Sequence, residues 1–190
     1  MSTTQKDGGK EGGKRAIVSS AHLVSERAAE TSAFEYGLYI ATNAFNRWIT
    51  RCMAAAGYPD MSALDVMVLH TVNHRARDKK LADICFVLNI EDSHTVNYAL
   101  KKLTRAGLVA GDKRGKEIFY ATTAEGQAAC VKYREVREDC LITAFSAFGG
   151  DPAGEGGRAG DLNQQIGEAA DLLRALSGLY DQAARSASSL

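Results

Sequence analysis

Two apolar stripes at helical spacing constrain the fold of this 190-residue chain more than any other feature of its sequence. Their members lie alternately four and three residues apart, first in Phe34, Leu38, Ala41, Phe45, Trp48, Cys52 and Ala55, and again in Leu162, Ile166, Ala169, Leu173, Leu176, Tyr180 and Ala183. This spacing places one apolar face along each of two long α-helices. Because a chain of this length has little to bury both faces against, we expect them to meet in a homodimer.

Between the stripes the pattern changes to short elements. Ser62-Ala-Leu-Asp65 has the form of a capping box and predicts a helix that ends near Asn73. A basic connector follows, and Asp78 is the expected N-cap of a short helix. The expected buried side of that short helix is formed by Leu81, Ile84, Cys85 and Leu88.

A polar turn separates this short helix from the next one, which we expect over about residues 92–106. Its apolar side chains share one face, and every side chain on the opposite face is a hydrogen-bonding group or a cation. The inner face consists of Val96, Ala99, Leu100 and Leu103. The outer face consists of His94, Asn97, Tyr98, Lys101, Lys102 and Arg105.

Two strand-like runs, Leu108–Ala110 and Ile118–Tyr120, enclose the turn residues of Gly111–Lys116. They predict a β-hairpin with a basic tip, over about residues 108–121. Thr122-Thr-Ala-Glu125 has the form of a second capping box, opening a helix to about Phe148.

The sequence therefore predicts a mainly α fold with a small β-hairpin wing, in which a winged helix-turn-helix is flanked by long dimerisation helices. The expected organisation is a flexible tail (1–20), an N-terminal dimerisation helix (21–60), the winged helix-turn-helix (61–122), a long linking helix (123–148), a Gly-rich linker (149–160) and a C-terminal dimerisation helix (161–190).

Charge is concentrated in this central region, although the whole chain has a formal net charge of zero. From His74 to Glu117 there are ten basic and six acidic residues, and the rest of the chain balances this surplus. A local surplus of positive charge indicates a face that meets an anion. A helix with an outward polar face fits the major groove of duplex DNA, where side chains reach base edges.

We therefore expect the helix at 92–106 to enter the major groove. Asn97 can pair with a base edge, whereas Lys102 and Arg105 are better placed for phosphates. The N–H groups near Ser93 can bind a further phosphate, and the wing is expected on the minor groove or the backbone. The expected DNA-binding residues are Ser93, His94, Thr95, Asn97, Tyr98, Lys101, Lys102, Arg105, Lys113, Arg114 and Lys116.

The stretch KKLTRAGLVAGDKRGKEIFYATTAEG, from Lys101 to Gly126, resembles the multiple-antibiotic-resistance regulator (MarR) family of winged helix-turn-helix transcription factors. The resemblance rests on LTRAGLV, the basic wing and the T-x-x-G-like opening of the next helix. It implies a cytoplasmic, bacterial-type homodimer that binds double-stranded DNA, modulated by a small-molecule effector. It also implies an effector pocket lined by Phe45, Trp48 and Tyr133, for which ordinary core aromatics are the alternative.

Other classes of function find less support. The motifs of nucleotide-binding loops, serine hydrolases and zinc proteases are missing from the sequence, so no enzyme activity and no cofactor are expected. His70 and His74 have a metal-ligand spacing without a third ligand nearby, and Cys52 and Cys85 fall on apolar faces, so neither a metal nor a redox site is expected. No apolar run is long enough for a membrane span. The competing interpretation is a winged helix that docks on another protein without binding nucleic acid.

Overall fold

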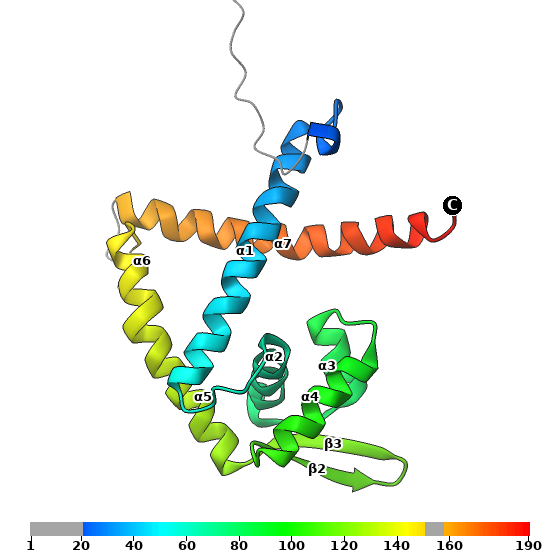
Figure 1. Cartoon of the computed structure of the whole chain (residues 1–190), viewed down its shortest axis with the longest axis vertical. Helices are drawn as coiled ribbons and strands as arrows, with labels where there is room; N and C mark the ends of the chain where they lie inside the picture. The colour runs from blue at the N-terminus through cyan, green and yellow to red at the C-terminus, as the bar shows by residue number, and fades with distance from the viewer. Residues whose placement is uncertain (1–20, 151–157) are drawn as a thin grey trace, which may run out of the picture. The chain divides into compact units, whose positions relative to one another are not determined.

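The computed structural model describes residues 21–150 and 158–190 (Figure 1). The expected tail (1–20) and residues 151–157 of the expected linker lie outside the described residues. The chain divides into two units, one ending at Arg51 and the other beginning at Cys52.

The described part of the first unit contains η1 (Ala21–Leu23) and most of α1 (Ala29–Ala55). The Ser25 hydroxyl accepts hydrogen bonds from the backbone N–H groups of Arg27 and Ala28, at 3.3 and 3.1 Å, just before α1 begins. The end of α1 lies in the second unit, just before Gly57. Gly57 has φ +106°, a conformation that glycine adopts without strain, and its N–H donates to the Ala54 carbonyl.

The second unit contains the expected elements in order, together with η2, β1 and η3, which the sequence did not predict. They are α2 (Ala63–Asn73), η2 (His74–Ala76), β1 (Lys79–Lys80), α3 (Leu81–Leu88), α4 (Ser93–Arg105), β2 (Val109–Arg114), β3 (Glu117–Thr122), α5 (Ala124–Arg137), η3 (Glu138–Ile142), α6 (Thr143–Ala147) and α7 (Arg158–Ala187). The fold is mainly helical with a small antiparallel sheet, which confirms the predicted fold class.

The capping box at the start of α2 is confirmed. The Ser62 hydroxyl accepts from the Asp65 N–H, and the Asp65 carboxylate accepts from the Ser62 N–H at 2.8 Å. The core of this unit is built from α2, α4 and α5, with Ile84 from α3 and the start of β2. Its fully covered side chains include Val66, Leu69, Val72, Ile84, Leu100, Leu103 and Leu108.

The N-cap predicted for α3 is wrong. The cap is Lys80, whose N–H donates to the Asp83 carboxylate at 3.0 Å. Lys79 and Lys80 are held as β1 by antiparallel pairing with Tyr120 and Phe119 of β3, so the helix cannot start at Asp78. The expected buried side of α3 is only partly confirmed, since Ile84 is buried but Leu81, Cys85 and Leu88 are half-buried.

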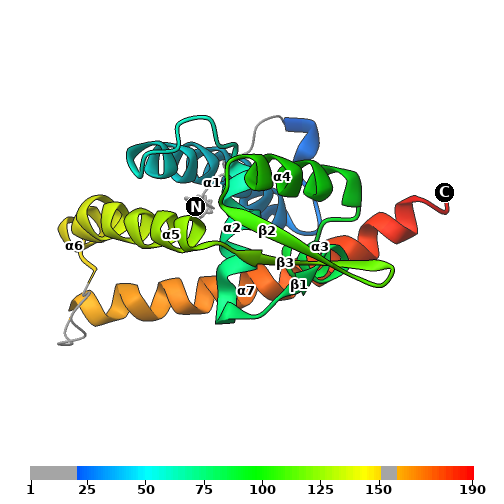
Figure 2. The same ribbon diagram turned by 90° about the horizontal axis from the view of Figure 1, so that it is seen from below.

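The wing is longer than its two apolar runs indicated. Arg114 pairs with Glu117, so only Gly115 and Lys116 form the turn, and Gly115 has φ +65°. The sheet has the strand order β1-β3-β2, and Figure 2 shows it beside α3 and α4. Backbone pairing extends through Gly111–Arg114 because strand hydrogen bonds do not require apolar side chains.

The second capping position is one residue later than expected. Thr122 ends β3 and donates to Asn73 Oδ1 at 3.0 Å, whereas Thr123 caps α5 by accepting from the Gly126 N–H. The Thr123 hydroxyl also donates to the Gly107 carbonyl at 2.6 Å. Gly126 is so close to Leu108, the residue just before β2, that a Cβ atom at position 126 would collide with the Leu108 carbonyl oxygen. The start of α5 is therefore fastened directly to the start of the hairpin.

The expected helix from this cap to Phe148 is interrupted. After α5 the chain makes one π-helical turn, η3, before α6 completes the helix at Ala147. The C-terminal helix α7 covers the second apolar stripe. Among the described helices, none is long and apolar enough to cross a membrane.

Candidate nucleic-acid interface

Helix α4 has the two-faced character that its sequence predicted. Asp92 caps it by accepting from the His94 N–H at 2.9 Å, and the Thr95 hydroxyl donates back to the Asp92 carbonyl. The four expected inner residues are each no more than 1% exposed. On the other side, Ser93, His94, Thr95, Tyr98, Lys101 and Arg105 are exposed. The buried stripe anchors the helix, so its polar edge faces solvent.

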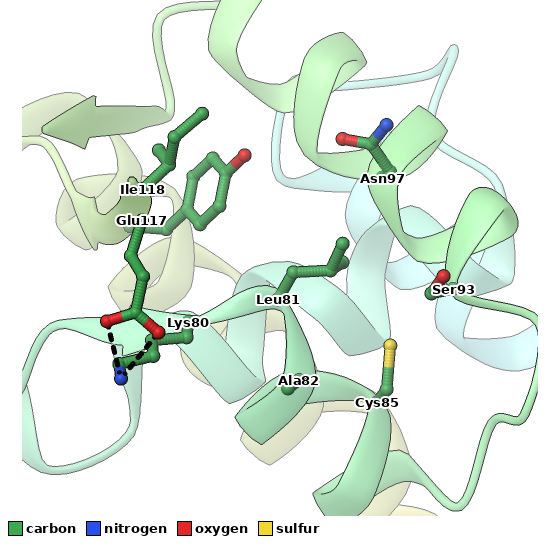
Figure 3. A pocket seen from close by; sticks show the side chains of 9 residues that line it. Lys80, Leu81, Ala82, Cys85, Ser93, Asn97, Glu117 and Ile118 are labelled. Carbon is green, nitrogen blue, oxygen red and sulfur yellow. Dashed lines mark hydrogen bonds and ion pairs between the residues drawn. The ribbon is translucent and has the colours of Figure 1, made fainter. Parts of the chain in front are cut away.

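Asn97 lies between these two faces. It is half-buried and lines a hollow of about 610 Å³ between α4 and the sheet. Figure 3 shows Asn97, Cys85 and Ile118 around this hollow, each from a different element. The full lining is Lys80, Leu81, Ala82, Cys85, Ser93, Asn97, Glu117, Ile118 and Tyr120.

A second hollow, of about 740 Å³, shares Asn97, Ile118 and Tyr120 with the first. It is lined by Asn97, Tyr98, Lys101, Thr104, Arg105, Gly111, Ile118 and Tyr120. A side chain at Gly111 would lie 3.1 Å from Ile118 and 3.3 Å from Tyr120, so glycine keeps this surface open. The two hollows form one groove between α4 and the wing, which we call the α4–wing groove.

The cations on the wing are of two kinds. Lys113 and Lys116 are exposed, and no ion pair joins either of them to another described residue. Arg114, in contrast, donates to Asp112 at 2.7 Å and to Asp78 at 2.5 Å. These two hydrogen bonds, first that to Asp112, raise the pKa of Arg114 above its ordinary value. Lys113 and Lys116 are thus free to meet an external anion, whereas Arg114 is neutralised within the chain.

The aromatic ring of Phe119 supports this arrangement. The Arg114 guanidinium lies 4.7 Å from its centroid, and the Lys80 ammonium lies 5.3 Å from it. Lys80 is also paired with Glu117 at 2.7 Å. These contacts join β1, β2 and β3, so they stiffen the base of the wing.

Lys102 does not share the exposure of its neighbours on α4. Its ammonium lies 2.6 Å from the buried Asp65 carboxylate and donates to the Asp60 carbonyl at 2.5 Å. Both partners lie at the start of α2. Lys102 therefore ties α4 to α2, and its charge is already paired within the chain.

Lys79 is a structural residue that the sequence reasoning missed. Its side chain is buried, and its ammonium donates to the carbonyls of Val72, His74 and Arg77 at 2.9, 2.5 and 2.9 Å. Burial lowers its pKa, and the nearby Arg77 lowers it further. No sequence signal separates Lys79 from the other cations of this connector, because its role depends on how the loop closes.

Comparisons with known proteins agree with this geometry. Residues 61–126 match the family model of a winged helix DNA-binding domain. Among curated proteins, none matches the chain in sequence. A MarR-family transcriptional regulator from Rhodococcus sp. RHA1 is 12% identical, with 80% of this chain and 97% of that one covered at a TM-score of 0.58.

A mutant MarR from E. coli, solved in complex with operator DNA, is 15% identical, with 76% of this chain and 99% of that one covered at a TM-score of 0.56. This chain has the MarR fold. NadR in complex with 4-hydroxyphenylacetate is a further example, at 19% identity, 74% and 89% coverage and a TM-score of 0.52. At the level of fold, the resemblance seen in the sequence is confirmed.

The three residues expected to line an effector pocket do not all belong to the same unit. Phe45 and Trp48 belong to the first unit, where Phe45 is exposed and Trp48 is half-buried. Tyr133 is buried on α5, and its ring meets the His70 ring edge-on, with 4.5 Å between centroids. Burial raises the pKa of Tyr133 to about 12. The roles of all three residues in an effector pocket stay predictions.

Two cysteines of this chain, Cys52 and Cys130, are buried within the second unit. Burial raises the pKa of the Cys52 thiol, which donates to the Tyr133 carbonyl at 3.5 Å, and it raises the pKa of Cys130 to about 11. Both are therefore protonated thiols at neutral pH and poor nucleophiles. Among the described residues, no three His, Cys, Asp or Glu side chains gather as a metal site.

Proposed function

We propose that the chain is a dimeric, sequence-specific DNA-binding transcription regulator of the MarR type, which acts in the cytoplasm. The observation that carries this proposal is the α4–wing groove, which is flanked on both sides by cations that form no ion pair with another described residue. Lys101 and Arg105 stand on the α4 side, and Lys113 and Lys116 stand on the wing. Phosphate contacts from these four residues supply affinity and position the helix.

Sequence recognition is assigned to the middle of α4. Tyr98 is 66% exposed on the outer edge of the helix, and Asn97 faces the α4–wing groove. The Asn97 amide can pair bidentately with an adenine edge, and the Tyr98 ring can contact a thymine methyl group. His94 and Thr95, near the start of the helix, are exposed at the same edge.

The proposal assigns the hairpin to the adjacent backbone or minor groove. Lys113 and Lys116 carry the free charge there, whereas Arg114 contributes by holding the hairpin in shape. Lys102 has a similar internal role on α4. Arg114 and Lys102 are therefore not among the side chains proposed to contact phosphate directly.

Dimerisation is proposed from the apolar side chains that α7 leaves exposed. Ile166, Leu172, Leu173 and Leu179 are each 45–55% exposed on this 30-residue helix. Apolar surface of this extent is typical of an interface. A two-fold dimer would present two copies of α4 to successive major grooves, about 34–36 Å apart on a palindromic site.

The proposed regulator also responds to a small molecule. NadR, which shares the fold, was solved in complex with 4-hydroxyphenylacetate. A cavity of about 390 Å³ in the second unit of this chain, lined by Tyr133 among other residues of α2 and α5, supports the same kind of control here.

The test is selection of bound duplexes from sheared genomic DNA by the purified full chain, followed by salt titration on the most enriched fragment. A palindromic consensus with half-sites one helical turn apart is the expected result. The logarithm of the binding constant should fall linearly with the logarithm of salt concentration. Failure to enrich any duplex at low salt would contradict DNA binding and favour the protein-docking alternative.

A further inference from the structure

The outer half of the hairpin is held by three consecutive residues of the connector between α2 and α3, Asp78–Lys80. The Asp78 carboxylate accepts from Arg114 of β2 at 2.5 Å. The next two residues pair as β1 with β3, and the Lys80 ammonium reaches the carboxylate of Glu117, as Figure 3 shows. The position of the wing therefore depends on the position of this short segment.

Lys79 joins this segment to α2. Consecutive side chains of an extended segment point to opposite sides, so Lys79 and Lys80 cannot both face the wing. The Lys79 side chain is buried, and its ammonium donates to the carbonyls of Val72, His74 and Arg77. An ammonium has three N–H donors, so each of them is used. Two of the three carbonyls lie at the C-terminal end of α2, where a helix leaves carbonyl groups without helical partners and favours a cation.

The rest of the connector does little to hold its own shape. Arg75 has φ +60°, in the left-handed region that a residue with a Cβ atom adopts at a cost in energy. The side chains of His74, Arg75 and Arg77 are exposed, so burial of these side chains does not hold the loop. The three carbonyl groups that meet at the Lys79 ammonium fix the path of the connector instead.

The base of the hairpin is held differently. Thr122 donates to Asn73, and Leu108, just before β2, lies against Gly126. These contacts lie at the end of the hairpin opposite the turn, so they do not replace β1 at its outer half. Loss of the Lys79 ammonium should therefore loosen the outer half of the wing and leave its base in place.

We propose that Lys79 is a positioning residue for DNA binding. Its ammonium holds the connector in the form that presents the wing, and with it Lys113 and Lys116, to the DNA backbone. Lys79 does not contact DNA in this proposal, because its side chain is buried and its three donors are used within the chain. The role in DNA binding rests on the proposed function, whereas the positioning of the wing does not.

The first experiment is hydrogen exchange of the free full chain, compared between the wild type and Lys79→Met. Methionine keeps an unbranched apolar stem and removes the ammonium. Amides of β2 and β3 near the turn should exchange about tenfold faster or more, while those of α4 keep the wild-type rate. Arg77→Met removes an exposed cation from the same connector and is the matched control, expected to exchange like the wild type.

Two results of this experiment would overturn the proposal. Unchanged exchange in the wing of Lys79→Met would show that the ammonium does not hold it. An equal rise in the wing and in α4 would show that Lys79 contributes to the stability of the whole unit and does not position the wing.

A rescue measurement separates the ammonium from the packing of the lysine stem. Lys79→Ala lacks three methylene groups and the ammonium, which propylammonium supplies together and 1-propanol supplies without the charge. At matched ionic strength, propylammonium should slow exchange in the wing of Lys79→Ala toward the wild-type rate, and 1-propanol should not. If the variants do not fold, recovery of the helical circular dichroism signal with propylammonium alone is the expected result. Equal effects of the two compounds would attribute the role to packing and refute the proposal.

Salt titration connects the wing to DNA. Lys79→Met should reduce the salt slope for the selected duplex by about 1.8, because the contacts of Lys113 and Lys116 with two phosphates are lost. Replacing both Lys113 and Lys116 by alanine should reduce the slope equally in the wild type and change nothing further in Lys79→Met. A wild-type slope in Lys79→Met, or a further loss on combination, would overturn the role in DNA binding.

Failure of this proposal and failure of the proposed function can be told apart. A wild-type chain that binds no duplex would contradict the proposed regulator, and hydrogen exchange would still decide whether Lys79 positions the wing. DNA binding with a wild-type slope in Lys79→Met would contradict the role of Lys79 and leave the proposed regulator intact.

Discussion

The ammonium of Lys102 on α4 lies 2.6 Å from the carboxylate of Asp65 on α2, which is almost fully buried. The same carboxylate oxygen accepts from the Ser62 N–H, so one acidic group both caps α2 and anchors α4. Lys102 therefore differs from Lys101 beside it, which is exposed.

The first prediction concerns this pair. Lys102→Ala should lower the free energy of unfolding by about 1–3 kcal/mol, because it leaves a buried carboxylate short of a donor. DNA affinity should fall while the salt slope stays as in the wild type. Lys101→Ala should leave stability within about 0.5 kcal/mol and reduce the slope by about 0.9. Urea denaturation and salt-dependent anisotropy measure both; a reduced slope in Lys102→Ala would show that Lys102 contacts phosphate.

The second prediction concerns sequence reading. Asn97→Ala should weaken binding to the selected site by about 1–3 kcal/mol, because it removes a bidentate partner for one base. Binding to an unrelated duplex should not change, since a neutral amide contributes little to phosphate attraction. Anisotropy with matched and scrambled duplexes tests this. Equal losses on both duplexes would exclude Asn97 as a base reader.

The third prediction concerns pH. Burial lowers the pKa of His70 below its ordinary value of 6.5, so the unfolded chain takes up the proton first as pH falls. The free energy of unfolding should therefore decrease below about pH 6.5, until the lower pKa of the folded state is passed. His70→Phe keeps a ring against Tyr133 and should lack this component. Denaturation of both proteins between about pH 8 and pH 5 isolates it, and parallel curves would argue against the buried neutral imidazole.

The fourth prediction concerns the assembly. Leu173→Glu places a charge in the apolar stripe of α7 and should shift the proposed dimer toward the 20.4 kDa monomer. Arg185→Glu, exposed on the opposite side of the same helix, should remain dimeric. Light scattering after gel filtration distinguishes the two. A Leu173→Glu variant with wild-type mass would place the interface elsewhere.

Local chemistry accounts for what the sequence predicted well. The capping box at Ser62 depends on neighbouring residues only, and the buried face of α4 follows from its periodicity. The order of elements and the wing followed from the same signals.

Long-range contacts account for what the sequence missed. The cap at Lys80 instead of Asp78 depends on pairing with β3, far along the chain. The internal pairing of Lys102 and Arg114, and the orphaned Nε2 of His70, likewise arise between elements. A sequence does not distinguish an exposed cation from one that is paired within the chain. The candidate DNA contacts could therefore be listed from the sequence, but the cations that are free to bind DNA could not be told apart from the paired ones.

The close approach of Gly126 to Leu108 has a mechanical consequence. The first turn of α5 touches the hairpin backbone to backbone, without a compressible side chain between them. We therefore expect a tilt of α5 to move the wing with it, because no side chain lies between the two backbones to take up the movement. Any signal received along α5 would change the angle at which Lys113 and Lys116 approach a second groove, even if α4 stayed still.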